Sequence, residues 1–211
     1  MRGASFVGSI IDGTSFTNVN LAGVDFTRAK LSAGKFVTEF RNVDLTGANF
    51  FAVNFGDVWF NKSKVTNANF SRAQMTEVIM NDLEGPGVNF YRANIQTIQF
   101  RRSVFTKANF SNISGQSAEI ADTNFERSDF SGASLRWASF KRSNLDNTTF
   151  RAADLRSVDL GTATTYGAIF DDSNLSKADL PATAGYASWN NSILAGAKGY
   201  NCSLLPGARC K

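Results

Sequence analysis

A large apolar residue recurs at every fifth position along most of this 211-residue chain. One series runs from Leu45 to Leu180, and an earlier series from Phe6 to Phe36 keeps the same period in another phase. A period of five matches neither the about 3.6 residues of a helical turn nor the strict alternation of a flat strand. A chain that turns a corner every five residues would place every large residue inside. We therefore expect a coil built from short straight sides.

A second period of 20 residues is superimposed on the first. Phenylalanine occupies only 13 of the 28 large-residue positions from Leu45 to Leu180, yet it fills all seven positions of one column. That column is Phe50, Phe70, Phe90, Phe110, Phe130, Phe150 and Phe170. The pattern predicts four five-residue sides per coil, with these rings stacked in the core and each pair adding about 0.5–1.5 kcal/mol beyond burial. At about 4.8 Å per coil, about ten coils would form a rod of about 50 Å.

Many large residues follow a small residue and then Asn or Asp, as in Ala48-Asn49-Phe50, Ala108-Asn109-Phe110 and Ala178-Asp179-Leu180. These runs resemble the A(D/N)LXX motif of the pentapeptide-repeat family, and the resemblance extends over about residues 4–180 and more weakly to 204. It implies an all-β fold, a right-handed quadrilateral parallel β-helix with four pentapeptides per coil, in agreement with the 20-residue period. We therefore expect one solenoid domain over residues 1–204 and a short C-terminal tail over residues 205–211.

The repeat changes phase near residues 36–40 and 181–189. The step from Phe36 to Phe40 is four residues, which we interpret as one missing residue, and a similar step precedes Trp189. Gly85, Gly115 and Thr165 stand where large residues are expected. Such breaks are either local bulges that still close the coil or binding loops, and we favour bulges.

The composition argues against catalysis. The chain has no histidine, so it holds no Ser-His-Asp or Cys-His arrangement, and no glycine-rich phosphate-binding motif is present. A coil filled by Phe and Leu also leaves no interior pocket in which a pair of carboxylates could be desolvated. We therefore predict that the protein is not an enzyme and has no catalytic residue, metal site, cofactor or small-molecule substrate.

Several exposed positions carry side chains that are suited to contact a partner. Three aromatic residues should point outward, although each could instead lie flat across a neighbouring coil. Five basic residues should share one side of the coil, namely Lys62, Arg101, Arg102, Lys141 and Arg142. Asp82 and Asp122 interrupt them, so we favour a balanced face over a basic stripe. The candidate partner surface is Trp59, Tyr91, Trp137, Arg101, Arg102, Lys141 and Arg142.

The compartment follows only in part from the sequence. No stretch approaches the about 20 apolar residues of a membrane helix, and no signal peptide is visible, so we expect a soluble protein without membrane insertion and favour the cytoplasm. Cys202 and Cys210 are the only cysteines. They are either two free thiols in a reducing compartment or a short terminal disulfide in an oxidising one.

We expect a structural or interaction protein that presents a rigid surface to a protein partner. The terminal coils of a solenoid have open edges, so end-to-end self-association is a further possibility.

Two alternative functions depend on surface charge. The resemblance extends to the quinolone-resistance members of the family, which bind DNA gyrase as DNA mimics through an acidic rod and dimerise through a hydrophobic C-terminal segment. This chain departs from them, because its net charge is +4 and Pro206 breaks its tail. The second alternative is an anionic surface bound through a basic stripe, although the interspersed acidic residues lead us not to expect nucleic acid.

Overall fold

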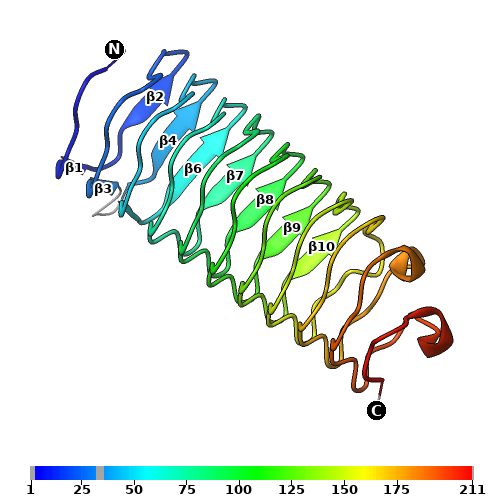
Figure 1. The fold of residues 1–211 in the computed structure, drawn as a ribbon. Coiled ribbons are helices and arrows are strands. Elements are labelled where there is room, and N and C mark those ends of the chain that lie inside the picture. Colours follow the sequence, from blue (N-terminus) through cyan, green and yellow to red (C-terminus); the bar gives the residue numbers. More distant parts are fainter. Residues whose placement is uncertain (1–2, 32–35, 211) are drawn as a thin grey trace.

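The computed structural model describes residues 3–31 and 36–210, which form one parallel β-solenoid with its termini at opposite ends of a rod (Figure 1). Its strands are β1 (Ile10–Ile11), β2 (Ser15–Thr17), β3 (Lys30–Leu31), β4 (Thr38–Arg41), β5 (Asn54–Phe55), β6 (Val58–Asn61), β7 (Ile79–Asn81), β8 (Gln99–Arg101), β9 (Glu119–Ala121) and β10 (Ser139–Lys141). Two 3₁₀ helices, η1 (Ala184–Tyr186) and η2 (Cys202–Leu204), lie at the C-terminal end.

One side of the rod carries a parallel sheet in the order β10-β9-β8-β7-β6-β4-β2. From β4 to β10, paired residues are 20 positions apart, as in Phe40 with Phe60 and Ile120 with Phe140. A shorter sheet, β1-β3-β5, lies on a second side, and isolated parallel bridges such as Asn49 with Asn69 join the rest. The predicted coil of four pentapeptides is therefore confirmed.

The predicted number of about ten regular coils exceeds the number of turns that contain β-strands. Six parallel pairings join the seven strands of the main sheet, so about six turns have a strand on that side. Single bridges continue the stacking beyond both ends of this sheet, from Ser5 to Arg209. A corner every five residues leaves at most a few extended residues per side, so most sides are joined by single bridges rather than by strands.

The interpretation of the first change of phase is wrong. Phe16 pairs with Phe40, and Leu31 pairs with Phe55, so these partners are 24 residues apart. This coil carries four additional residues rather than lacking one, and Phe36 is 69% exposed instead of occupying the core. Inserting four residues and deleting one residue change the phase of a five-residue repeat by the same amount, so the periodicity of the sequence could not distinguish them. Residues 32–35 lie outside the described residues.

The second change of phase shortens a coil by one residue. Ile169 bridges to Ser188, 19 positions later, and the Trp189 ring stacks on Phe170 with 4.4 Å between ring centroids. The indole N–H of Trp189 donates a hydrogen bond to the Ala184 carbonyl at 2.8 Å. Trp189 therefore takes the last place in the phenylalanine column.

The expected tail is not separate from the solenoid. Arg209 forms a parallel bridge with Ile193, and Leu205 is buried. Cys202 and Cys210 form a disulfide that closes this last segment, which decides between the two alternatives for the cysteines. The described residues after position 204 thus cap the C-terminal end of the rod.

The phenylalanine column forms a continuous stack through the core. From Phe50 to Phe170 the centroids of successive rings are 4.7–5.1 Å apart and their planes differ by 4–13°. Rings on the neighbouring column meet this stack edge to face, as Phe50 and Phe60 do at 6.1 Å and 88°. Both geometries suit the quadrupole of the aromatic ring.

The Asn or Asp residue before each large residue holds the corner. Asn69 Oδ1 accepts the backbone N–H of Ser71 at 3.1 Å, and Asn89 Oδ1 accepts that of Tyr91 at 2.9 Å. The Asn69 amide also donates to Asn49 Oδ1 of the preceding coil at 3.0 Å. These side chains therefore satisfy the backbone where the chain turns.

Side chains from the coils on either side fill the space beside the glycines at core positions. A Cβ at Gly85 would lie 2.7 Å from Val65 Cγ2 and 2.9 Å from Phe105 Cδ1. At Gly115 it would lie 2.8 Å from Leu135 Cδ2. The bridges on both sides keep the 20-residue register, so neither glycine marks a binding loop.

Phe110→Asp should lower the free energy of unfolding by more than about 4 kcal/mol, because it places an unpaired carboxylate inside the stack. Phe36→Asp makes the same change at an exposed position and should alter stability by less than about 1 kcal/mol. Urea denaturation of both variants measures the difference. Similar midpoints for the two variants would contradict the buried stack.

Asp171 ties the last coils together. Burial alone would raise its pKa, but hydrogen bonds from Ser188 Oγ at 2.6 Å and the Asn190 N–H at 3.0 Å, together with Arg151, hold the pKa below its ordinary value. The folded protein therefore binds this proton more weakly than the unfolded chain. The stabilisation is complete above the unfolded pKa of about 3.9 and is lost as the pH falls through the lower folded value.

Asp171→Asn should lower Tm by about 3–8 °C at pH 7, since it removes hydrogen bonds to a charged acceptor. The difference from the parent protein should shrink as the pH falls from about 5 to about 3. Thermal melts across this range test the prediction, which an equal difference at every pH would refute.

Candidate interaction surface

The outward side chains beside the main sheet alternate in charge. Lys62, Asp82, Arg102, Asp122 and Arg142 follow one another at 20-residue intervals, one per coil. Arg102 Nε lies 2.7 Å from Asp82 Oδ1, and Arg142 Nε lies 2.6 Å from Asp122 Oδ1. The hydrogen bond from each arginine holds the pKa of its partner carboxyl below the ordinary value. These cations compensate neighbouring acids, which supports a balanced face over a basic stripe.

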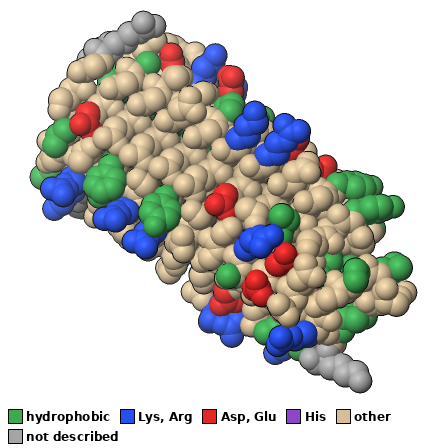
Figure 2. All heavy atoms as spheres, in the orientation of Figure 1, with side chains coloured by type: hydrophobic (Ala, Val, Ile, Leu, Met, Phe, Trp, Pro, Cys, Tyr) green, Lys and Arg blue, Asp and Glu red, His purple; other side chains and the backbone are tan. Residues whose placement is uncertain are grey.

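The other two basic residues of the predicted group flank a shallow groove on the same side. Arg101 Nη2 contacts Glu119 Oε2 at 3.3 Å, whereas Lys141 forms no ion pair among the described residues. Ala121 lies between them and its short side chain forms part of the groove lining, with Glu119 and Asp122 beside it. Figure 2 shows Lys and Arg side chains interspersed with Asp and Glu on the face of the rod that it presents.

The three predicted aromatic residues lie apart. Trp59 is exposed on β6, on the side that carries the five predicted basic residues. Tyr91 is half-buried on another side, where the Arg92 guanidinium lies 5.1 Å from its ring centroid. Trp137 stands at a corner and is 58% exposed. The seven residues therefore belong to three places rather than one surface.

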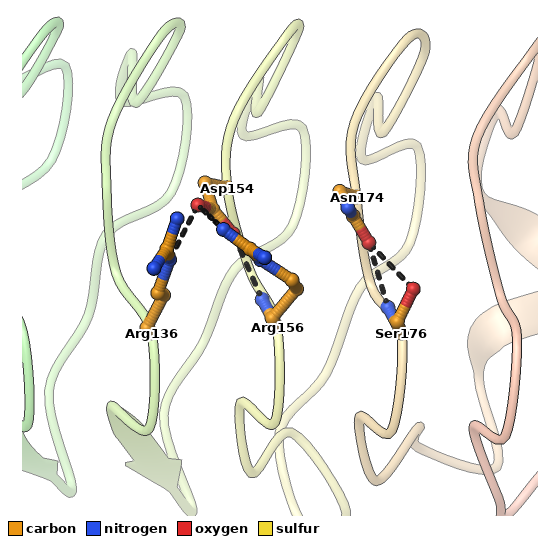
Figure 3. Close-up of polar contacts among 5 residues, drawn as sticks. All are labelled: Arg136, Asp154, Arg156, Asn174 and Ser176. Atoms are coloured by element: carbon orange, nitrogen blue, oxygen red, sulfur yellow. Dashed lines mark hydrogen bonds and ion pairs between the residues drawn. The ribbon is translucent and has the colours of Figure 1, made fainter.

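Trp137 has two arginine neighbours that the sequence analysis missed. Figure 3 shows Arg136 and Arg156, from successive coils, converging on Asp154. Arg136 Nε donates to Asp154 Oδ2 at 2.6 Å, while Arg156 Nε and Nη2 donate to its two oxygens at 2.8 Å each. The shared carboxylate thus fixes both guanidinium groups in place.

A hollow opens beside this pair at the corner of the coil. Trp137, Ser157 and Lys177 occupy the same corner on three successive coils, and the small Ser157 separates the two larger side chains. Arg136, Arg156, Asn174 and Ser176 complete the lining. We call this hollow, lined by Arg136, Trp137, Arg156, Ser157, Asn174, Ser176 and Lys177, the Trp137 notch. Arranging the sequence in 20-residue rows would have placed these residues together.

The charge of the notch is poorly balanced compared with that of the main sheet. Its lining supplies three cations, Arg136, Arg156 and Lys177, and Asp154 is the carboxylate that contacts two of them. Lys177 forms no ion pair within the part of the chain that the structure describes. The notch therefore presents about two uncompensated positive charges beside an exposed indole.

The backbone of Trp137 is unusual for its residue type. Its φ is 56°, and among the described non-glycine residues with positive φ it is the only aromatic one. A side chain with a Cβ costs roughly 1–2 kcal/mol in this left-handed region, which Gly and Asn tolerate best. The indole therefore occupies a corner where it gains little by burial and where the backbone disfavours it.

The described residues offer neither a metal site nor a membrane-spanning helix. They contain no group of His, Cys, Asp and Glu side chains arranged to hold a metal ion. No helix between residues 3 and 210, apart from the undescribed positions, has the length and hydropathy to cross a bilayer.

Models of two related families match the chain. The model described as "Pentapeptide repeat region" matches residues 36–110 and 53–130. The model described as "Pentapeptide repeats (8 copies)" matches residues 1–36, 118–156 and 133–163. The chain belongs to the pentapeptide-repeat family. Among curated proteins, none matches it significantly.

Solved pentapeptide-repeat structures resemble the chain distantly. HetL, involved in heterocyst differentiation regulation in the cyanobacterium Nostoc sp. strain PCC 7120, is 22% identical with a TM-score of 0.36, over 95% of this chain and 86% of HetL. A trypsin-treated form of QnrB1, a plasmid-mediated fluoroquinolone resistance protein, is 19% identical with a TM-score of 0.42, over 97% and 92%. A protein from the Arabidopsis thaliana thylakoid lumen is 27% identical with a TM-score of 0.26, over 47% and 56%.

Trp137→Asn should leave Tm unchanged or raise it by up to about 4 °C, because asparagine adopts positive φ more readily and the lost side chain is mostly exposed. Differential scanning calorimetry of the parent and the variant tests this. A Tm lowered by more than about 5 °C would show that the indole packs as part of the fold.

Proposed function

We propose that this protein is a non-catalytic interaction protein whose rigid solenoid presents the Trp137 notch to a protein partner. The observation that carries the proposal is an exposed tryptophan beside two arginines that Asp154 holds in place. Tryptophan and arginine are the residue types that most often dominate binding energy at protein interfaces. The positive φ of Trp137 is unfavourable for a tryptophan. A tryptophan at this position is therefore more consistent with a role in binding than with a role in stability.

The solenoid suits this role because the site is ordered before binding. Asp154 bridges to Ser134 and Asn174, and the backbone N–H of Trp137 donates to the Arg156 carbonyl at 3.1 Å. The backbone N–H of Ser157 donates to the Ser176 carbonyl in the same way, so backbone hydrogen bonds join the successive coils that carry the notch. A partner that docks here would lose little free energy to ordering the surface.

The surface charges favour this function over DNA mimicry. A mimic of DNA needs a continuous acidic face, whereas Arg102 and Arg142 alternate with Asp82 and Asp122 beside the main sheet. The notch itself is positive. Both observations are more compatible with a partner that carries a local negative charge.

Cross-linked capture from an extract of the source organism, quantified by mass spectrometry, tests the proposal. Trp137→Asn should abolish the enrichment of at least one protein that the parent enriches. Trp59→Asn is the matched control, because it removes an exposed indole from another side of the rod. This variant should enrich that protein as the parent does. Retention by the Trp137 variant, or equal loss in both variants, would overturn the proposal.

A further inference from the structure

Three exposed surfaces combine cations with a hollow or with aromatic rings. The groove over Ala121 contains Glu119 and Asp122, which already engage arginines. On another side, Arg72 lies 5.8 Å from the Phe51 ring centroid and Arg92 covers Tyr91, so the protein's own cations occupy those rings. In the Trp137 notch, Asp154 engages Arg136 and Arg156, but Lys177 forms no ion pair among the described residues. Among the described residues, no cation or aromatic ring stacks on the Trp137 indole.

The notch keeps hydrogen-bond donors that its own carboxylate does not use. An arginine side chain has five N–H donors. Arg136 gives Asp154 only Nε, and Arg156 gives it Nε and Nη2. The remaining donors, together with the Lys177 ammonium, are suited to a second anion with two oxygens. Because Asp154 fixes the planes of both guanidinium groups, this anion would meet donors that are already oriented.

The spacing of the coils indicates the length of the ligand. Trp137 and Lys177 stand two coils apart, which is about 10 Å along the rod. In an extended peptide, residues i and i+2 project to the same side and are about 7 Å apart. An apolar side chain against the indole would therefore place the side chain two residues later over Ser157, within reach of Arg156 and Lys177. A carboxylate is the group that these donors require.

A short segment fits the surroundings of the notch better than a long polyanion does. On the two preceding coils the same corner carries Gln116, Ser117, Gln96 and Thr97, which are uncharged. A nucleic acid strand that extended along the rod would therefore find no further cations beyond the notch in that direction. A segment of a few residues would meet only the three cations and the indole.

We propose that the Trp137 notch binds an extended segment of its protein partner in which an apolar or aromatic residue is followed two positions later by Asp or Glu. The apolar side chain packs on Trp137, and the carboxylate binds between Arg156 and Lys177. This assignment rests on the function proposed above. The partner is thus recognised through a short motif rather than through a large complementary surface.

Fluorescence polarisation with labelled eight-residue peptides tests the motif. The probe set is GGFEDEGG, its Leu and Trp counterparts, the amide form GGFQNQGG and the form without an apolar residue, GGGEDEGG. At least one acidic apolar peptide should bind with a Kd below about 1 mM and at least about tenfold tighter than both comparison forms. Trp137→Asn should weaken this binding about tenfold or more, and Trp59→Asn should not.

A charge exchange tests the carboxylate contact independently of the indole. Arg156→Glu should weaken binding of GGFEDEGG about tenfold or more and restore part of it for GGFEKEGG, in which lysine replaces the central acidic residue. Equal weakening for both peptides would contradict a direct contact. Calorimetric melts of Arg156→Glu provide the control for folding.

Two outcomes would overturn the motif. One is the absence of binding by every acidic peptide up to about 1 mM, and the other is tighter binding of a ten-residue oligothymidylate than of any peptide. If Trp137→Asn still loses its partner in cross-linked capture, the proposed function stands and only the motif is wrong. If that capture also fails, the notch is not the interaction site.

Discussion

The parallel stacking of phenylalanine rings is the interaction on which this structure depends. Successive rings from Phe50 to Phe170 lie 4.7–5.1 Å apart, close to the about 4.8 Å between hydrogen-bonded strands. Ring contact and backbone pairing therefore demand the same rise per coil. Neither interaction has to be strained to satisfy the other, and Trp189 extends the stack after the coil has lost a residue.

Because the core and the corners constrain three of every five residues, only two positions per side remain free to vary. The inward residues are buried, and the Asn or Asp between them binds the backbone at the turn. The remaining two outward positions form columns that run along the rod, with one residue per coil. The ladder of Lys62, Asp82, Arg102, Asp122 and Arg142 is such a column, and Trp137, Ser157 and Lys177 form another. Any functional surface on this solenoid must be composed from columns of this kind.

Sequence patterns predicted the parts of the structure that repeat. The period of five, the period of 20 and the phenylalanine column follow from where side chains can be buried, and they hold in the structure. The four additional residues between Leu31 and Phe40 could not be recognised, because inserting four residues and deleting one change the phase of a five-residue period equally. The clamp of Arg136 and Arg156 on Asp154 was also missed, since side-chain rotamers rather than spacing decide which of several nearby charges meet. The groups that were predicted to form one partner surface share a side only in part, because Tyr91 and Trp137 belong to other columns.

The sequence by itself determined the coil, its 20-residue register from Phe40 to Phe170 and the identity of the buried column, because hydrophobic burial acts on every repeat in the same way and leaves a periodic record. It also placed Cys202 and Cys210 close together without deciding whether they bond. Only the tertiary structure decided that they form a disulfide, that the residues after 204 complete the last coil, and that Arg102 and Arg142 are compensated whereas Lys177 is not. These features depend on contacts between single residues on neighbouring coils, and such contacts occur once rather than in every repeat.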